Sequence, residues 1–99
     1  MTRLNDEQRA AIARTHPAWT LHDESMRRTY VFADFNAAMG FVNRVALASE
    51  VADHHPDIEI RWNKVTLVLT THSAGGLTTK DTDLATVFDG FAREPEAPA

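Results

Sequence analysis

Apolar side chains recur at helical spacing in three segments of the chain. Asn5 and Gln8 have the spacing of a helix N-cap, and this first helix is expected to end before His16-Pro17. Thr78 and Asp81 have the same spacing and predict the start of the last helix. The last helix is expected to bury one stripe of side chains: Leu84, Ala85, Phe88 and Phe91.

The central helix is expected to follow Asp34, a residue that favours the N-cap position, and to run to about Asp53. Pro56 forbids any continuation. Gly40 lies inside this helix at a cost of up to about 1 kcal/mol relative to alanine, so it is expected to permit close packing on a sheet. The residues that recur at helical spacing are Phe35, Met39, Val42, Ala46 and Ser49, flanked by Phe41, Val45 and Ala48, and this stripe is expected to face inward.

Two regions, residues 19–32 and 58–70, instead have the composition or the alternating apolar and polar pattern of β-hairpins. Trp19 and Trp62, one in each region, are expected in the core. Combined with the helices, the hairpins give the order α-β-β-α-β-β-α. This order predicts an α+β fold with a four-stranded antiparallel sheet and three helices packed on one face.

The register of the second hairpin can be predicted from its loop. A two-residue loop at Asn63-Lys64 would place Trp62 opposite Val65, which keeps the apolar residues of both strands on one face. If the pairing continued outward, His55 would lie opposite His72 with Cβ atoms roughly 5 Å apart. This register therefore predicts that the two histidines are neighbours.

Composition limits the classes of protein and of partner. The chain has 99 residues, is 43% hydrophobic and has no cysteine, so we expect one domain over residues 1–99, without disulfides and with a disordered tail at 94–99. The net charge is −4 and the basic residues are scattered, so we expect no nucleic-acid partner. No apolar run is long enough to span a membrane, and we expect a cytoplasmic protein.

Three histidines, His54, His55 and His72, lie where the central helix and the last strand are expected to end. Glu50 and His54 are four residues apart, so they are expected to share a helix face on which the carboxylate favours the protonated imidazole. Imidazoles titrate near neutral pH, so one can donate a proton while another accepts one. This cluster predicts proton transfer on a small organic substrate.

Other interpretations of these residues remain open. The His-His pair could be only a loop that ends a helix, and His72 only an exposed strand end. A metal site with Glu50 as a fourth ligand is a further alternative, but adjacent histidines point in different directions and no His-x-x-x-His spacing occurs, so we expect no metal. We expect His16 and His22 to be solvated. Asp81 is explained by helix capping, although it could also orient a histidine.

Ordered motifs across nearly the whole chain resemble one known family. Residues 50–56 read Glu-Val-Ala-Asp-His-His-Pro, residues 62–65 Trp-Asn-Lys-Val, and residues 69–72 Leu-Thr-Thr-His. Gly-Leu-Thr at 76–78 follows, with Asp81 beyond it. This series resembles the signature of the pterin-4a-carbinolamine dehydratases.

The resemblance implies dehydration of 4a-hydroxytetrahydropterin to quinonoid dihydropterin, which recycles the cofactor of aromatic amino-acid hydroxylation. It implies His54 and His72 as the main acid–base pair, with His55 positioning the substrate and assisting. It also implies a homodimer or homotetramer that needs no cofactor, because the pterin is the substrate. The substrate-binding residues are expected to be Glu50, Asp53, His54, His55, Thr70, Thr71, His72 and Ser73, with Pro56 and Asp81 in structural or supporting roles.

The chain departs from the family pattern in two places. Ile58 stands where many animal members have tryptophan, and Trp62 where tyrosine is common, which puts the shape of the pocket in doubt more than the activity. Two alternative functions stay open. One is a protein-binding or dimerisation module, because animal members also dimerise a homeodomain transcription factor. The other is an enzyme that acts on a different pterin.

Overall fold

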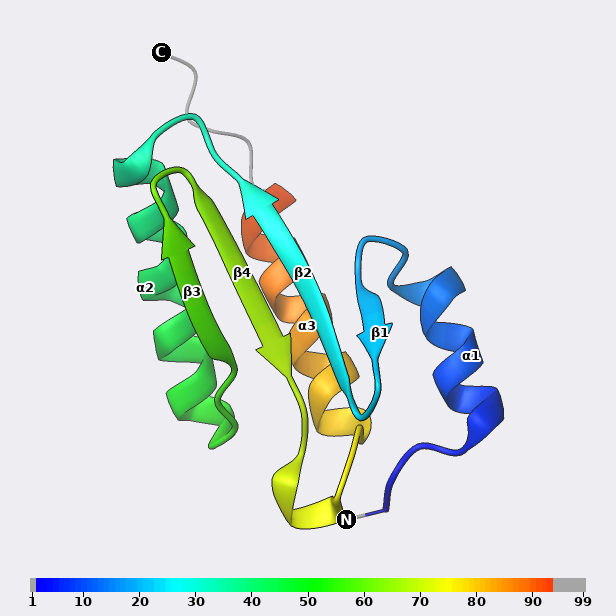
Figure 1. Ribbon diagram of the computed structural model, residues 1–99. Helices are drawn as coiled ribbons and strands as arrows, with labels where there is room; N and C mark the ends of the chain where they lie inside the picture. The colour runs from blue at the N-terminus through cyan, green and yellow to red at the C-terminus, as the bar shows by residue number, and fades with distance from the viewer. Residues whose placement is uncertain (1, 94–99) are drawn as a thin grey trace.

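A computed structural model describes residues 2–93 of the chain (Figure 1). Its elements in chain order are α1 (Asp6–Thr15), β1 (Thr20–His22), β2 (Ser25–Val31), α2 (Phe35–Ala52), β3 (Asp57–Arg61), β4 (Lys64–Leu69), the single-turn helix η1 (His72–Ala74) and α3 (Thr79–Arg93). The disordered tail expected at 94–99 lies outside the described residues. No helix in the described part of the chain is both long and apolar enough to cross a membrane.

The four strands form one antiparallel sheet in the order β1-β2-β4-β3. β2 and β4 pair at its centre, from Met26 opposite Leu69 to Val31 opposite Lys64, and so join the two hairpins. In Figure 1, α2 and α3 lie behind the sheet and α1 lies beyond its β1 edge. The α+β fold and its element order, as predicted from the sequence, are confirmed.

The helix starts follow from local hydrogen bonds. The Asn5 side chain accepts from the Gln8 N–H, and the Gln8 side chain accepts from the Asn5 N–H, both at 2.8 Å. Asp34 accepts from the Ala37 N–H at 2.8 Å. These contacts satisfy amide groups that have no partner within the helix, and they confirm both predicted N-caps.

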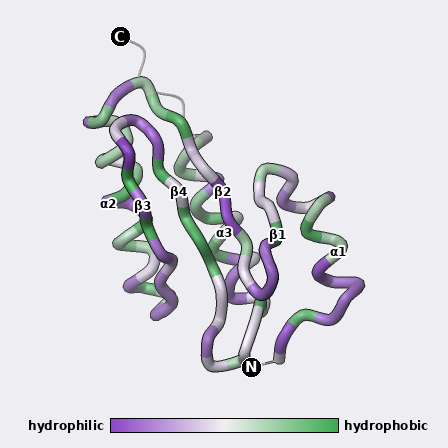
Figure 2. Tube along the Cα trace, in the orientation of Figure 1, coloured by the Kyte–Doolittle hydropathy of each residue, from purple (hydrophilic) through white to green (hydrophobic). Residues whose placement is uncertain are grey.

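The core lies between the sheet and the helices. Figure 2 shows hydrophobic residues along β4, and Val65, Leu67 and Leu69 of that strand are fully buried. They pack in one cluster with apolar side chains of β2 and the helices, namely Ile12, Met26, Tyr30, Ala38, Phe41, Val45, Leu84, Ala85 and Phe88. The prediction for the last helix is therefore confirmed, with Phe91 partly buried against the same cluster.

A buried carboxylate, Asp89, links α3 to the first hairpin. It accepts hydrogen bonds from Trp19 Nε1 at 3.0 and 3.1 Å, from the Tyr30 hydroxyl at 2.6 Å and from Arg28 NH1 at 2.6 Å. The Arg28 guanidinium also lies 4.2 Å from the Tyr30 ring centroid. Burial, together with the neighbouring Asp89, raises the pKa of the Tyr30 phenol well above its usual range.

Three predictions about packing are wrong. The buried face of α2 is formed by Ala38, Phe41, Val45 and Ser49, so the expected stripe is wrong at Phe35, which is 51% exposed, and its centre lies on the flanking residues Phe41 and Val45. Trp62 is 69% exposed at the hairpin tip, unlike Trp19, which is buried as expected. A Cβ added at Gly40 would meet no atom within 4 Å, so close packing on the sheet does not explain this glycine.

The register predicted for the second hairpin is also wrong, by two residues. The turn is Trp62-Asn63, so Arg61 pairs with Lys64 and Ile58 with Leu67. Trp62 adopts the left-handed conformation with φ of 52°, and Asn63 is held by hydrogen bonds in both directions with Phe32. A shift of two residues keeps the same side chains inward, which explains why the apolar pattern could not reveal the error.

The N-terminal segment is tied to the loop after β4. The Leu4 N–H donates to the Leu77 carbonyl at 2.8 Å, and Arg3 NH1 donates to the Gly75 carbonyl at 3.4 Å. Arg3 and Arg9 both pair with Glu24 in the β1–β2 turn, at 3.8 and 3.5 Å. Residues distant in the sequence therefore support the loop that carries His72.

Candidate functional site

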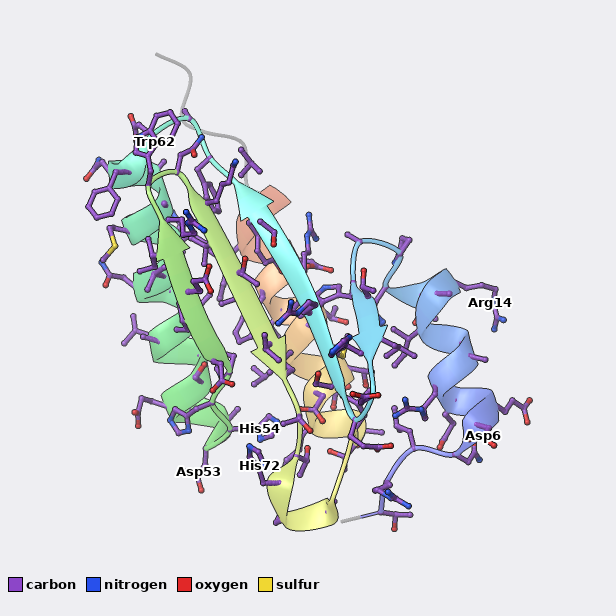
Figure 3. All side chains as sticks on the ribbon, in the orientation of Figure 1. Asp6, Arg14, Asp53, His54, Trp62 and His72 are labelled. Carbon is purple, nitrogen blue, oxygen red and sulfur yellow. The ribbon has the colours of Figure 1, made fainter. Side chains whose placement is uncertain are left out.

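Three segments supply the predicted site: the end of α2, the loop after β4 and the start of α3. Figure 3 shows His54 and His72 at the same end of the molecule, near the end of α2. A short series of contacts joins the segments. His54 Nε2 lies 2.5 Å from Asp81 Oδ1, and the Thr71 hydroxyl, one residue before His72, donates to Asp81 Oδ2 at 2.7 Å.

The position of His54 follows from the way in which α2 ends. Asp53 takes the left-handed conformation with φ of 50°, and the His54 N–H then donates to the Ser49 carbonyl at 3.1 Å. This turn is a common helix ending, and it directs the chain out of the helix before Pro56. The His54 side chain is consequently only 11% exposed and faces α3.

Asp81 performs both roles that the sequence suggested. Its carboxylate is fully buried and accepts the Thr78 N–H at 3.0 Å, which caps α3 as predicted. The other carboxylate oxygen contacts His54, so Asp81 also orients a histidine. The Asp81 side chain therefore both caps the start of α3 and orients the imidazole ring of His54.

The expected pairing of Glu50 with His54 is wrong. Glu50 instead contacts His55, with Oε1 and Nε2 3.3 Å apart, and both side chains are more than half exposed. The reason is that α2 ends at Ala52, so position 54 no longer lies one helical turn above position 50. Nor does strand pairing oppose His55 to His72, because β3 begins only at Asp57, opposite Val68.

The segment after β4 contains both buried and exposed residues. Thr70 donates through its hydroxyl to the Glu24 carbonyl at 2.6 Å, and Thr71 is 4% exposed. His72 and Ser73, on η1, are exposed. Asp53, at the end of α2, is exposed as well. The accessible members of the predicted set are therefore Glu50, Asp53, His55, His72 and Ser73, with His54 and Thr70 partly accessible.

Two pockets adjoin the histidines. One of about 230 Å³ is lined by His54 together with Lys80, Asp83 and the apolar residues Ala52, Leu84 and Val87. Another of about 370 Å³ includes His72, Thr70 and His22. Sequence reasoning missed Lys80, Asp83 and His22. The capping motif at Thr78 could have signalled the first two, because it places them in the first turns of α3.

The two remaining histidines differ from each other. His22 is exposed, as expected. His16 is partly buried and its Nε2 lies 2.8 Å from the Thr86 hydroxyl on α3, so the expectation that it is solvated is wrong. Within residues 2–93, no three His, Cys, Asp or Glu side chains are grouped so that they could hold a metal ion. His54 and His55 contact different carboxylates.

Comparisons with known proteins agree with the resemblance. The sequence profile described as "Pterin 4 alpha carbinolamine dehydratase" matches residues 2–91. The chain belongs to this family. A relative from Picosynechococcus sp., named "Putative pterin-4-alpha-carbinolamine dehydratase", is 51% identical over 88 residues, which are 89% of this chain and 96% of the relative. A relative of the same name from Thermomicrobium roseum is 52% identical over 85 residues, 86% of this chain and 91% of its own.

Solved structures extend the comparison to the dehydratase fold. A transcriptional coactivator/pterin dehydratase from Brucella melitensis superposes with a TM-score of 0.88 and 33% identity, covering 92% of this chain and 99% of its own. A pterin dehydratase-like protein identified as a RuBisCO assembly factor in the α-carboxysome has a TM-score of 0.64 at 18% identity, over 78% of this chain and 89% of its own. The second likeness concerns the fold alone.

Proposed function

We propose that the protein dehydrates 4a-hydroxytetrahydropterin to quinonoid dihydropterin by histidine acid–base catalysis, and so recycles a tetrahydropterin cofactor. The observation that carries the proposal is the contact of His54 with the buried carboxylate of Asp81, which also holds Thr71, the residue before His72. In a member of the pterin dehydratase family, this arrangement supports a pair of imidazoles beside one substrate.

The chemistry requires two proton movements. The C4a–O bond breaks as the departing hydroxyl receives a proton and leaves as water, and N5 loses its proton as the C4a=N5 bond forms. The N5 lone pair supplies the electrons, so positioned imidazoles are sufficient for the step. We assign the two proton movements to His54 and His72, with His55 positioning the substrate. The exposed polar groups of Glu50, Asp53 and Ser73 would bind the polar edges of the pterin.

A stopped-flow assay with freshly generated 4a-hydroxypterin tests the proposal. Replacing His54 or His72 by alanine should lower the dehydration rate by about 10²- to 10⁴-fold, the usual contribution of a positioned acid or base. His16→Gln, which changes a histidine bonded to Thr86 outside the site, should retain the rate. If both alanine variants dehydrated the substrate as fast as the wild type, the assignment would be wrong.

The same samples distinguish the alternative functions. A stoichiometric protein partner recovered by pull-down, together with no turnover, would favour a protein-binding module. Turnover of a different pterin, but not of the 4a-hydroxytetrahydropterin, would favour a related enzyme. The expected location, the cytoplasm, remains a prediction.

We further propose that the chain forms a homodimer or homotetramer through α2. Leu47 and Val51, one turn apart on this helix, are 70% and 90% exposed and belong to one contiguous apolar patch, which is typical of an interaction surface. They border an apolar groove of about 490 Å³ between α2 and α3. Light scattering should give a multiple of the chain mass for the wild type and a smaller mass for Leu47→Glu. A monomeric wild type would contradict this.

A further inference from the structure

We propose that Thr71 is a positioning residue that acts through Asp81 to hold His54 with a hydrogen on Nε2, so that Nδ1 is the nitrogen that exchanges protons with the substrate. The proposal rests on the proposed function. It assigns a role to the Thr71 side chain that differs from direct contact with the pterin.

The hydrogen-bond network centres on the carboxylate of Asp81. The carboxylate has no exposed surface and has three neighbours within hydrogen-bond distance: His54 Nε2 at 2.5 Å, the Thr71 hydroxyl at 2.7 Å and the Thr78 N–H at 3.0 Å. An ionised carboxylate only accepts hydrogen bonds, so all three neighbours donate. His54 Nε2 therefore carries its hydrogen whether the ring is neutral or protonated. Only Nδ1 is left to gain and lose a proton.

The polar groups of Thr71 all have partners within the protein. Its N–H donates to the Gly76 carbonyl at 3.2 Å, and its carbonyl accepts from Ala74 and Gly76 at 3.1 and 3.2 Å. Its hydroxyl donates to Asp81 and lies 2.9 Å from the Thr78 hydroxyl. Since Thr71 is only 4% exposed, its side chain can influence the substrate chiefly through Asp81.

The hydroxyl hydrogens of the network point in one direction, from Thr78 to Thr71 and from Thr71 to Asp81. The Thr71 hydroxyl and the Thr78 N–H both contact Oδ2 of Asp81, which leaves Oδ1 for His54. A hydroxyl has one hydrogen, so the donation from Thr71 to Asp81 makes the Thr78 hydroxyl the donor to Thr71. This chain of donors fixes the orientation of the carboxylate plane. The carboxylate plane in turn fixes the orientation of the His54 imidazole ring.

The experiment compares Thr71→Val with Thr71→Ser, which retains the hydroxyl, and reads both the kinetics and the nitrogen-15 NMR signals of His54. Thr71→Val should lower kcat by about 10- to 100-fold, the usual cost of losing a group that orients a working histidine, with little change in KM. Because the Thr71 hydroxyl no longer fixes the carboxylate plane, the nitrogen-15 signals of His54 should shift and broaden, while the hydrogen stays on Nε2, since Asp81 still only accepts. Thr71→Ser should restore both. The matched control is Thr29→Val, because Thr29 bonds Thr66 on the sheet at 2.8 Å.

A second variant keeps the test decisive if Thr71→Val does not fold. In Asp81→Asn, the donors Thr71 and Thr78 require the amide oxygen at the Oδ2 position, so the amide NH₂ must face His54. Nε2 would then become an acceptor and the hydrogen would move to Nδ1. We expect an inverted tautomer and a loss of about 100-fold or more in kcat.

The proposal fails if His54 in the wild type does not carry its hydrogen on Nε2, if Asp81→Asn leaves the tautomer unchanged, or if Thr71→Val leaves the His54 signals unchanged. It also fails if Thr71→Val has wild-type kcat. Failure of the proposed function has a different signature. The wild type would then show no dehydration, while the NMR signals of His54 would still report the network.

Discussion

Removal of the Asp89 carboxylate should destabilise the protein without impairing the chemistry of the folded molecule. Asp89 is 8% exposed and is the acceptor shared by Trp19, Tyr30 and Arg28. It lies eight residues after Asp81 on α3, which corresponds to about 12 Å along a helix. Asp89→Ala therefore acts on the packing of α3 against the first hairpin, away from the histidines.

The size of the stability loss in Asp89→Ala follows from the hydrogen-bond donors that lose Asp89 as their acceptor. Trp19 and Tyr30 are 4% and 3% exposed, so neither donor can turn to water without disrupting the packing. A buried group left unsatisfied costs about 1–3 kcal/mol, which gives roughly 2–6 kcal/mol for the two. Arg28 is about a quarter exposed, so water can replace its lost acceptor and Arg28 adds little to the loss of stability. We expect a loss of about 3–5 kcal/mol, in line with breaking a buried charged network.

Urea denaturation followed by circular dichroism measures this loss as a lower transition midpoint. Asp83→Ala provides the control for stability, because Asp83 is an exposed carboxylate on the same helix. The dehydration rate, corrected for the folded fraction, should remain that of the wild type in Asp89→Ala. A destabilisation of less than about 1 kcal/mol would refute the reasoning, because it would mean that the three donors find other partners.

Two other predictions concern pH and the hairpin turn. Because burial raises the pKa of Tyr30, its contribution to stability is complete below its ordinary pKa of about 10 and falls at higher pH by up to about 1.4 kcal/mol per unit. Tyr30 is the only tyrosine in the sequence, so tyrosinate absorbance should appear together with unfolding, and its appearance in a still folded protein would contradict the assignment. Trp62→Asn should raise the free energy of unfolding by about 1 kcal/mol, because asparagine tolerates the left-handed conformation. An unchanged or lower urea midpoint would show that Trp62 is not strained.

The features predicted correctly from the sequence have local causes. The Asn5–Gln8 capping box, the Asp34 cap and the Thr78–Asp81 pair each depend on residues three apart, so each could be recognised in one short segment. The strands follow from alternation, and the order of elements then leaves few possible topologies. The fold class could therefore be inferred without knowledge of any tertiary contact.

The failed predictions depend on backbone conformations that the pattern does not encode. The left-handed conformation of Trp62 moves the hairpin turn by one residue, and no glycine or asparagine at that position signals it. The left-handed Asp53 ends α2 and sends His54 towards Asp81 instead of Glu50. Both positions have an L-residue with positive φ, which is uncommon and difficult to anticipate from composition.

The candidate site was only partly predictable. Family motifs pointed to His54 and His72, while the contact between His54 and Asp81 needed the three-dimensional arrangement of α2 and α3. The presence of His22 beside His72 depends on the pairing of β2 with β4. That pairing joins the two hairpins across the sheet, and no short-range signal in either hairpin specifies it.

The contacts of the N-terminal segment with the loop after β4 affect how shortened versions of the protein should be interpreted. Leu4 and Arg3 hold residues 75–77, and the same loop carries His72. A version that begins at Asn5 would keep every proposed proton-transfer residue and yet lose two anchors of that loop. Reduced activity of such a version would reflect a loosened loop, and it would not assign a chemical role to the residues removed.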